Sequence, residues 1–480
     1  MIQDKSYSND MLSPVNLFFV NTSLSNTNDI YAPLGCLYLV AAVRQAGYEI
    51  QFRDYQTSSS RSSLETSALA KYLTVTQGVL AVGCMHNMLP SVVAALELIK
   101  HADPSRLAIL GGPGPSGVAQ ALLERFPWLD VIVIGEGEAT FVELLHCLKS
   151  GSDIKSVCGI AFRDSAGVHI TPSRQLLSNL DSLPPPAYDC VNKDDYAHVG
   201  IMTARGCPCG CTFCSTTQFW RRAYRTRSIG KVMDDIRTGL TMGLITEMVH
   251  ITDDTFPLSP VRVAEFAQRY KAEFPSLPFG CMMRIDQIVR NPIVIDDLLK
   301  AGLSAAFIGV ESGSASVLRR LGKPYTADDT MNVVTYLAGR LRNLQLSFIW
   351  GFPFETRKDF MTTQILMQRI YAKFGKKVKL DLLFSQLSPM PQTTIYDEYV
   401  GQLAFSEKFL SAVVMTSGDS GQALSDRRAY VEPDARTKVL IRENKDVFAG
   451  FCYVKSDAFA ETSQLAEGAH LLLRQILEAV

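Results

Sequence analysis

The ten residues RGCPCGCTFC, at positions 205–214, hold four of the chain's eleven cysteines. A short apolar run, Val199–Thr203, precedes them and has the pattern of a β-strand. Thiolates are soft ligands that suit iron–sulfur clusters or zinc. The stretch therefore predicts a metal site on a loop that directly follows a strand.

Downstream of this loop, apolar runs alternate with segments of helical spacing. The further candidate strands are Glu247–Ile251, Phe279–Met283, Ala305–Val310, Gln345–Ile349 and Val378–Phe384. Six strands joined by crossover helices predict a partial (β/α)6 barrel over residues 195–400. Barrel active sites lie at the carboxyl ends of the strands, which is where the cysteine loop begins.

The first part of the chain, residues 1–150, repeats the alternating pattern. Its candidate strands are Val15–Asn21, Glu49–Phe52, Gly78–Gly83, Leu107–Leu110 and Asp130–Ile134. This order predicts an α/β domain, a doubly wound parallel sheet of Rossmann-like type. Residues 151–194 predict a hairpin around Ser165-Ala166-Gly167 and a proline-rich linker, and residues 401–480 predict a small, mostly helical C-terminal region.

The composition limits the partners. Lys and Arg number 47 against 48 Asp and Glu, so the net charge is −1, which argues against nucleic-acid binding through a bulk electrostatic field. The N-terminus lacks an apolar stretch typical of a secretory signal, and no apolar run approaches the ~20 residues that span a bilayer. We therefore expect a cytoplasmic protein with no membrane and no nucleic-acid partner.

The cysteines allow two registers. Cys207, Cys211 and Cys214 form C-x3-C-x2-C, whereas including Cys209 gives four sulfurs. The three-cysteine spacing resembles the radical S-adenosylmethionine (SAM) superfamily, in which three cysteines hold a [4Fe–4S] cluster whose fourth iron binds SAM. We favour this register over a structural zinc loop, because zinc sites usually take two separated pairs and no second pair occurs elsewhere.

Other barrel motifs also resemble that superfamily. They are HITDDTF after the second strand, GVESGS after the fourth, IWGFPFET after the fifth, and LSPMPQTTIYDEY after the sixth. The resemblance implies SAM contacts, which we assign to Asp253, Asp254, Arg284, Glu311, Ser312 and Gly351. Phe354 and Gln392 stand where the family usually has glycine, so the loop geometry there is open.

The implied SAM contacts have specific roles. Asp253 and Asp254 are expected at the amino group, and Arg284 at the carboxylate. Glu311 and Ser312 are expected near the ribose and carboxylate, and Gly351 beside the adenine. The structural alternatives are a helix N-cap for either aspartate and an ion pair for Arg284.

The N-terminal segments PLGCLYLVAAVRQAGYEI and AILGGPGPSG…DVIVIGEGE resemble the cobalamin-binding domain that precedes many radical SAM barrels. Gly111 and Gly112 are expected to let the cobalamin tail pass close to the sheet edge, with the helix starting at Ser116 facing its phosphate. The text GPGPSG also fits a dinucleotide fingerprint, but it follows the fourth strand rather than the first, so NAD or FAD is the weaker reading.

The cobalamin family's D-x-H-x-x-G element is absent near the first strand, and residues 22–32 hold no histidine. Bound cobalamin should therefore have no histidine ligand from that loop. His86, near the third strand end, is the remaining candidate for an axial ligand, although a lone histidine is more often merely hydrogen-bonded.

The resemblance implies a cobalamin-dependent radical SAM enzyme. Its expected cofactors are a [4Fe–4S] cluster, SAM and cobalamin, with an external electron donor of flavodoxin or ferredoxin type. Its expected reaction is methylation of an unactivated carbon of a small molecule, through a 5′-deoxyadenosyl radical and methylcobalamin. No catalytic side chain is assigned.

The alternatives to methylation remain open at this point. The same cofactors also serve oxidation, cyclisation or rearrangement without methyl transfer. A methylthiotransferase would need a second cluster, and Cys36, Cys84 and Cys147 are expected on separate elements. A non-catalytic cobalamin sensor or carrier would need no cysteine loop.

Overall fold

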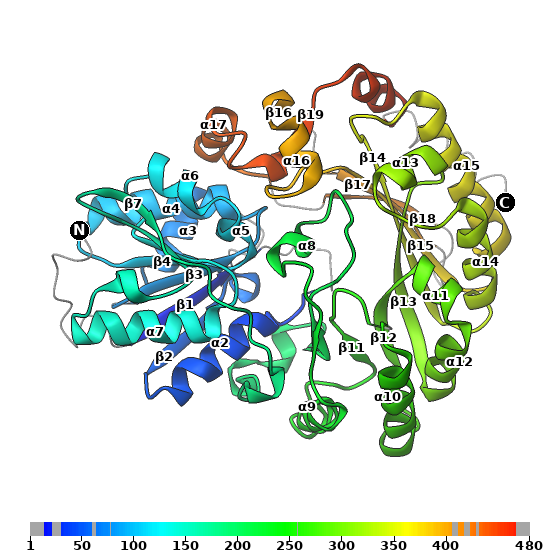
Figure 1. Cartoon of the computed structure of the whole chain (residues 1–480), viewed down its shortest axis with the longest axis horizontal. Coiled ribbons are helices and arrows are strands. Elements are labelled where there is room, and N and C mark those ends of the chain that lie inside the picture. Colours follow the sequence, from blue (N-terminus) through cyan, green and yellow to red (C-terminus); the bar gives the residue numbers. More distant parts are fainter. Residues whose placement is uncertain are drawn as a thin grey trace. The chain divides into compact units, whose positions relative to one another are not determined.

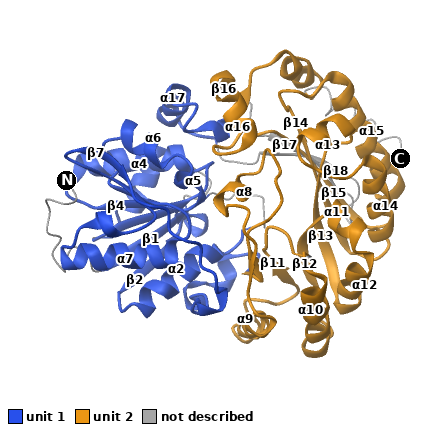
Figure 2. Cartoon of the chain, viewed as in Figure 1, with its two compact units in different colours: residues 1–199, 430–451 blue, residues 200–429, 452–480 orange. Residues whose placement is uncertain are grey.

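The computed structural model describes residues 14–21, 30–59, 64–76, 78–256, 258–405, 411–416, 423–428 and 432–466. The chain divides into two compact units, coloured separately in Figure 2. Unit 1 comprises residues 1–199 and 430–451, and unit 2 comprises residues 200–429 and 452–480. The chain therefore leaves unit 1, returns to it with a short segment, and ends in unit 2.

Unit 1 is built on a seven-stranded sheet of order β2-β1-β3-β4-β5-β6-β7. Its strands are β1 (Val15–Val20), β2 (Ile50–Asp54), β3 (Leu80–Cys84), β4 (Ala108–Gly111), β5 (Val131–Val133), β6 (Ile160–Asp164) and β7 (Gly167–Ile170). The first five are parallel, which confirms the doubly wound sheet. The predicted hairpin is formed by β6 and β7, which extend the sheet in antiparallel direction.

Helices cover both faces of this sheet, because its strands are apolar on both sides (Figure 1). They are α2 (Leu34–Gln45), α3 (Thr66–Leu73), α4 (Leu89–Ala102), α5 (Pro113–Ser116), α6 (Ala119–Arg125), α7 (Gly137–Ser150) and α17 (Ala435–Glu443). Helix α2 packs against α7, and α3 packs against α4.

The returning segment, residues 430–451, is fastened to unit 1 by α17, which packs on α4. Asp434 caps α17 by accepting a hydrogen bond from the Thr437 backbone N–H at 2.8 Å. The same carboxylate accepts from the Thr66 N–H at 2.7 Å, at the start of α3. One side chain thus satisfies backbone donors at two helix N-termini.

Unit 2 contains an eight-stranded sheet of order β18-β17-β15-β14-β13-β12-β11-β8. Its strands are β8 (Gly200–Ile201), β11 (Val249–Ile251), β12 (Phe279–Arg284), β13 (Leu303–Glu311), β14 (Asn343–Trp350), β15 (Lys379–Gln386), β17 (Ser411–Thr416) and β18 (Ala423–Arg428). The six strands β8, β11, β12, β13, β14 and β15 of this sheet are parallel, as predicted for a six-stranded partial barrel. Strands β17 and β18 join in antiparallel direction and were not predicted.

The helices of unit 2 are α8 (Ser215–Phe219), α9 (Ile229–Thr241), α10 (Pro260–Glu273), α11 (Ile285–Arg290), α12 (Pro292–Ala301), α13 (Ala315–Arg320), α14 (Ala327–Leu337), α15 (Arg357–Phe374) and α16 (Thr394–Tyr399). Along β14, Leu344, Leu346 and Phe348 are fully buried while their neighbours are half-exposed. This alternation leaves one face of the sheet packed and the other partly open.

The described residues of the C-terminal region, 401–480, mix helix and strand. Besides α17, residues 457–466 are helical, and β16 (Leu403–Phe405) pairs with β19 (Cys452–Val454). In the part of the chain that the structure describes, no helix combines the length and apolar character needed to cross a membrane.

Candidate functional site

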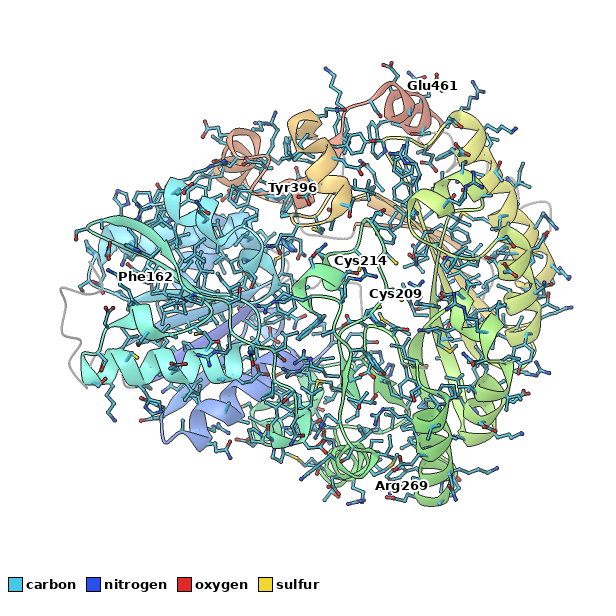
Figure 3. All side chains as sticks on the ribbon, in the orientation of Figure 1. Phe162, Cys209, Cys214, Arg269, Tyr396 and Glu461 are labelled. Atoms are coloured by element: carbon cyan, nitrogen blue, oxygen red, sulfur yellow. The ribbon has the colours of Figure 1, made fainter. Side chains whose placement is uncertain are left out.

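The cysteine loop connects β9 (Ala204–Arg205) to α8 and lies inside a narrow hairpin, because β9 pairs with β10 (Arg225–Thr226). Gly206 opens the loop with φ +89°, and a Cβ there would lie 2.1 Å from the carbonyl oxygen of Ala223. Only glycine fits this position, since both the backbone angle and the space exclude a side chain. Figure 3 labels Cys209 and Cys214 in this part of unit 2.

The cysteines of this loop differ in burial. Cys207 and Cys211 are buried, whereas Cys209 and Cys214 are half-buried. The Cys214 N–H donates to the Cys211 carbonyl oxygen at 3.2 Å. The Cys207 thiol donates a hydrogen bond to the sulfur of Cys209, which lowers the pKa of Cys209 to about 6.

The donor set of this loop fits an iron–sulfur cluster in chemistry and spacing, since three thiols follow one another on one short segment. Among the described residues, no three Cys, His, Asp or Glu side chains already form a group that could hold a metal ion. The thiols of Cys207, Cys211 and Cys214 must therefore turn toward a common point to act together.

Arg284, at the end of β12, contacts this loop directly. Its Nη1 donates to the Cys211 sulfur at 3.2 Å, and its Nε donates to the Asp286 carboxylate at 2.9 Å. The ion pair expected as the structural alternative is therefore present. The guanidinium thus joins the cysteine loop to Asp286. Its contact with the SAM carboxylate stays a prediction.

Glu311 ends β13 with φ +62°, an uncommon angle for a residue with a side chain. Its Oε1 accepts a hydrogen bond from Lys323 Nζ at 2.8 Å, and both side chains are less than a tenth exposed. A Cβ at Gly309 would lie 2.4 Å from that same Oε1, so this glycine makes room for the carboxylate.

Lys323 is a site residue that sequence reasoning missed. Burial acts to lower its pKa, but the charges of Glu311 and, more weakly, Tyr325 and Cys211 outweigh burial and raise the pKa above its usual value. Its Nζ also lies 5.6 Å from the centre of the Phe213 ring. Nothing in the text RLGKPYT signals that this lysine is buried, because lysines in loops are usually exposed.

Asp253 is enclosed by the strand segment that leads into the cysteine loop. Its Oδ1 accepts from the backbone N–H groups of Thr203 at 2.7 Å and Ala204 at 3.0 Å, and its Oδ2 accepts from the Thr203 hydroxyl at 2.5 Å. Burial raises the pKa of Asp253 to about 6, although these hydrogen bonds act to lower it. In this structure Asp253 positions the loop, and its expected contact with SAM stays a prediction.

Asp254, the next residue, is exposed. Its Oδ2 accepts from the Gly206 N–H at 3.2 Å, and the side chains of Thr216 and Trp220 also donate to it. It therefore lies against the cysteine loop and still reaches solvent. The N-cap alternative for both aspartates is wrong, because α10 begins after Ser259.

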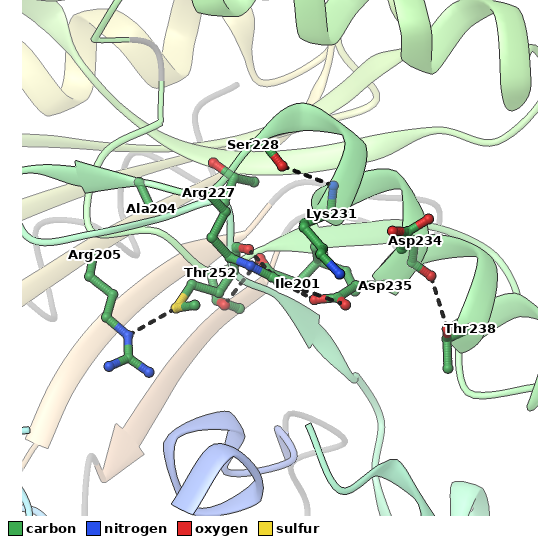
Figure 4. A network of polar contacts seen from close by, with 12 residues as sticks. Ile201, Ala204, Arg205, Arg227, Ser228, Lys231, Asp234, Asp235, Thr238 and Thr252 are labelled. Atoms are coloured by element: carbon green, nitrogen blue, oxygen red, sulfur yellow. Dashed lines mark hydrogen bonds and ion pairs between the residues drawn. The ribbon is translucent and has the colours of Figure 1, made fainter. Parts of the chain in front are cut away.

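Two arginines hold the segments on either side of the loop. Arg227 pairs with Asp235 of α9, and both side chains are almost fully buried (Figure 4). Arg262 donates to the carbonyl oxygens of Arg227 and Thr203, at 2.5 Å and 3.0 Å. The segments before and after the cysteine loop are thereby tied to α9 and α10.

Ser312 is fully buried, and its hydroxyl bonds to the Thr363 hydroxyl at 2.9 Å on α15. The Gly313 N–H also donates to Thr363, at 3.0 Å, and the Ser314 hydroxyl donates to Asp359 at 2.5 Å. The GVESGS loop is thus fixed to α15. The structure directs Ser312 toward that helix, so its SAM contact remains a prediction.

Gly351 directly follows β14 and has φ +83°, and a Cβ there would lie 3.2 Å from the Phe459 ring. Its N–H donates to Glu355 Oε2 at 2.7 Å. Glu355 is fully buried, and burial raises its pKa to about 8, against the lowering effect of that N–H. The other oxygen, Oε1, has no hydrogen-bond partner among the described residues. A carboxyl group in this state is mostly neutral at pH 7.

The candidate cobalamin edge of unit 1 is glycine-rich. Gly112 has φ +92°, and a Cβ there would lie 3.0 Å from the Cys84 carbonyl oxygen, so the chain's own backbone requires this glycine. At Gly111 a Cβ would meet only Val133, at 3.7 Å, which is an ordinary contact. Because internal packing does not require Gly111, its small size fits the approach of an external group.

Ser116 and His86 are both candidates for contacts with cobalamin. The helix expected to start at Ser116 begins instead at Pro113 and breaks at Gly117, since α5 and α6 are separate. Ser116 uses its hydroxyl to bond Gly112 O at 2.7 Å and Gly135 N at 3.2 Å. His86 follows β3, and burial lowers its pKa to about 4, so its imidazole is neutral at pH 7.

Comparison with known proteins matches each unit to a family. The model of the radical SAM superfamily matches residues 201–366, and the model of the B12 binding domain matches residues 22–145. Both ranges contain the loops described above.

Curated relatives and a solved structure extend the likeness over most of the chain. An uncharacterized methyltransferase of Pyrococcus horikoshii is 26% identical over 87% of this chain and 90% of its own length. The anaerobic magnesium-protoporphyrin IX monomethyl ester cyclase of Cereibacter sphaeroides is 27% identical over 78% of this chain and 61% of its own length. The cobalamin-dependent radical SAM enzyme OxsB has the same fold, with a TM-score of 0.67, 18% identity, and coverage of 96% of this chain and 67% of that one.

The two family models fall on separate units, in the order that the sequence motifs predicted. Their combination settles which cofactors the fold is built for: a [4Fe–4S] cluster and SAM in the barrel, and cobalamin in the N-terminal sheet. The chain is thus a radical SAM enzyme that contains a B12-binding domain.

Proposed function

We propose that the protein transfers a methyl group from SAM to an unactivated carbon of a small molecule, in a cobalamin-dependent radical reaction. The observation that carries this proposal is the presence of both cofactor domains in one chain, together with likeness to a methyltransferase over 87% of the chain. The cofactors supply the chemistry: SAM with the cluster supplies a hydrogen-abstracting carbon radical, and cobalamin supplies the methyl group.

The residues of unit 2 would hold and orient the cluster and SAM. Cys207, Cys211 and Cys214 would ligate the cluster, with the Arg284 guanidinium in contact with the Cys211 sulfur. Asp254 is the exposed carboxylate beside the loop and fits the positively charged SAM amino group. The buried thiols of Cys207 and Cys211 limit access of water and oxygen to their sulfurs.

The residues of unit 1 would leave space for the corrin. Gly111, at the end of β4, is a position where internal packing does not require the absence of a side chain. We propose that the tail of cobalamin passes at this point, and that no histidine from residues 22–32 binds its cobalt. The reductant is proposed to be an external flavodoxin or ferredoxin, in a cytoplasmic setting without nucleic-acid or membrane partners.

A second candidate function keeps both cofactors without methyl transfer. Likeness to an enzyme named a cyclase, which extends over 78% of the chain, favours this outcome. The substrate radical would then be oxidised, cyclised or rearranged.

Labelled SAM distinguishes the two candidates. The anaerobic enzyme, loaded with iron, sulfide and cobalamin, is incubated with dithionite as reductant, SAM carrying an isotopic methyl label and an extract of small molecules. We expect 5′-deoxyadenosine and a labelled product, neither of which should form with the Cys211→Ala variant. Deoxyadenosine without labelled product would contradict methyl transfer and support the second candidate.

A further inference from the structure

The turn that follows α13 is built against the cysteine loop. A Cβ at Gly322 would lie 3.1 Å from the carbonyl oxygen of Gly210. Thr212 donates its N–H to Leu321 O at 3.3 Å and its hydroxyl to Arg320 O at 3.1 Å. These contacts join two backbone segments that are 108 residues apart in sequence at Thr212 and Arg320.

Lys323 extends from this turn and faces two groups of the candidate site. Its ammonium donates a hydrogen bond to Glu311 at 2.8 Å and lies 5.6 Å from the centre of the Phe213 ring. Phe213 lies between Cys211 and Cys214 in the sequence. Tyr325 braces the same strand end by donating to the Gly309 and Val310 carbonyl oxygens, at 3.0 Å and 3.2 Å.

The charge of Lys323 has a fixed place, because the side chain is only 5% exposed and its ion pair lies out of solvent. In such surroundings a charge acts more strongly on its neighbours than it would in water. A cation held beside Phe213 of the cysteine loop should stabilise additional negative charge on that loop, whereas the Glu311 carboxylate should oppose it.

We propose that Lys323 is a positioning residue that couples the cysteine loop to Glu311 and raises the reduction potential of the cluster. This inference rests on the proposed function, since it requires the cluster. The step concerned is a one-electron reduction: the cluster gains one electron, and an external one-electron reductant loses it. Lys323 transfers nothing; its positive charge partly balances the electron that arrives.

The test is a redox titration of the reconstituted full chain, without SAM, followed by electron paramagnetic resonance with dithionite as reductant. Lys323→Met removes the charge at similar length, and Lys323→Arg retains it. Lys300→Met is the matched control, because Lys300 lies on α12 with its side chain 70% exposed. Iron content and circular dichroism are recorded for each variant.

We expect Lys323→Met to shift the midpoint potential to a more negative value, with Lys323→Arg close to the wild type and Lys300→Met unchanged. Lys323→Met should also weaken the spectral change that SAM causes, since Glu311 loses its partner. A folded, iron-loaded Lys323→Met protein with the wild-type potential would overturn the proposal.

Glu311→Gln keeps the proposal testable if Lys323→Met does not fold. This variant removes the opposing anion and keeps the lysine, so the potential should move to a more positive value. An unchanged or more negative potential in this variant would contradict the inference. A wild-type chain that binds no iron would overturn the proposed function itself. That result differs from an iron-loaded chain whose midpoint potential does not depend on Lys323.

Discussion

The strand ends of the two sheets are filled in different ways. In unit 2, charged side chains meet there in buried pairs, such as Lys323 with Glu311 and Arg284 with Asp286. In unit 1, the buried carboxylate at the end of β2, Asp54, is held by neutral partners, and the loop after β4 is shaped by glycines that fit the backbone of β3.

This difference indicates which kind of ligand each edge suits. Burying charged pairs is expensive and rarely improves stability, so the pairs of unit 2 indicate that its edge is organised around charge. A cluster of thiolates and a zwitterionic SAM are charged ligands. At the edge of unit 1 the turn after β4 is formed by glycines, which suits contact with a large ring system through shape.

The largest effect should come from the cysteine loop. Cys211→Ser should reduce the iron content from about four per chain to near zero, because only two of the three thiols at the C-x3-C-x2-C spacing then remain for a [4Fe–4S] cluster. Cys209→Ser is the matched control and should keep its iron. An iron assay after anaerobic reconstitution measures both. Loss of iron in Cys209→Ser would show that the cluster uses the four-sulfur register instead.

The second effect separates two neighbouring carboxylates. Asp253→Ala leaves three buried donors of Thr203 and Ala204 without their acceptor and should lower the free energy of unfolding by about 3 kcal/mol. Asp254→Ala should cost no more than about 0.5 kcal/mol, since that side chain is exposed, but should weaken SAM binding. Urea unfolding and a SAM titration measure the two effects. Equal destabilisation by the two variants would contradict the assigned roles.

The third effect depends on pH. Glu355 has a pKa raised from the usual 4.5 to about 8, so its protonated form stabilises the fold, and that contribution is lost as the pH rises through 8. Between pH 7 and 9 the wild type should lose about 1.4 kcal/mol relative to Glu355→Gln, which cannot ionise. Thermal melting across this range measures the difference. Parallel melting curves for the two proteins would show that Glu355 ionises normally.

The smallest change in stability is expected at Gly111, and Gly112 is the contrasting position beside it. Gly112→Ala should cost about 1–2 kcal/mol in stability, because its positive φ is strained for alanine and Cys84 O is close. Gly111→Ala should barely change stability but should reduce cobalamin affinity, as judged by absorbance after desalting. If Gly111→Ala retains cobalamin as well as the wild type, then the tail does not pass at this position.

The fold was largely predictable because each parallel strand is a short apolar run followed by helical spacing. The strands β16 to β19 were not, since β16 pairs with β19 far along the chain, and β17 and β18 add in antiparallel direction to a sheet whose other strands are parallel. The break between α5 and α6 was missed because Ser116 looked like a helix start, whereas the proline at 113 already begins one.

The candidate site was predictable where chemistry and spacing coincide in one stretch, as in Cys207, Cys211 and Cys214. It was not predictable where a side chain's role depends on burial. Asp253 and Asp254 are neighbouring residues of the same type, yet Asp253 is enclosed by Thr203 and Asp254 reaches solvent. Lys323 carried no signal, because only the folded chain brings it to Glu311.

The central claim is that one chain holds two cofactors, each at the strand ends of its own sheet. The most direct test is to reconstitute the protein anaerobically with iron, sulfide and hydroxocobalamin, desalt it, and count both cofactors. We expect about four irons and about one cobalamin per chain. Four irons with no cobalamin would contradict it, because unit 1 would then be a scaffold and methyl transfer through cobalt would have to be abandoned.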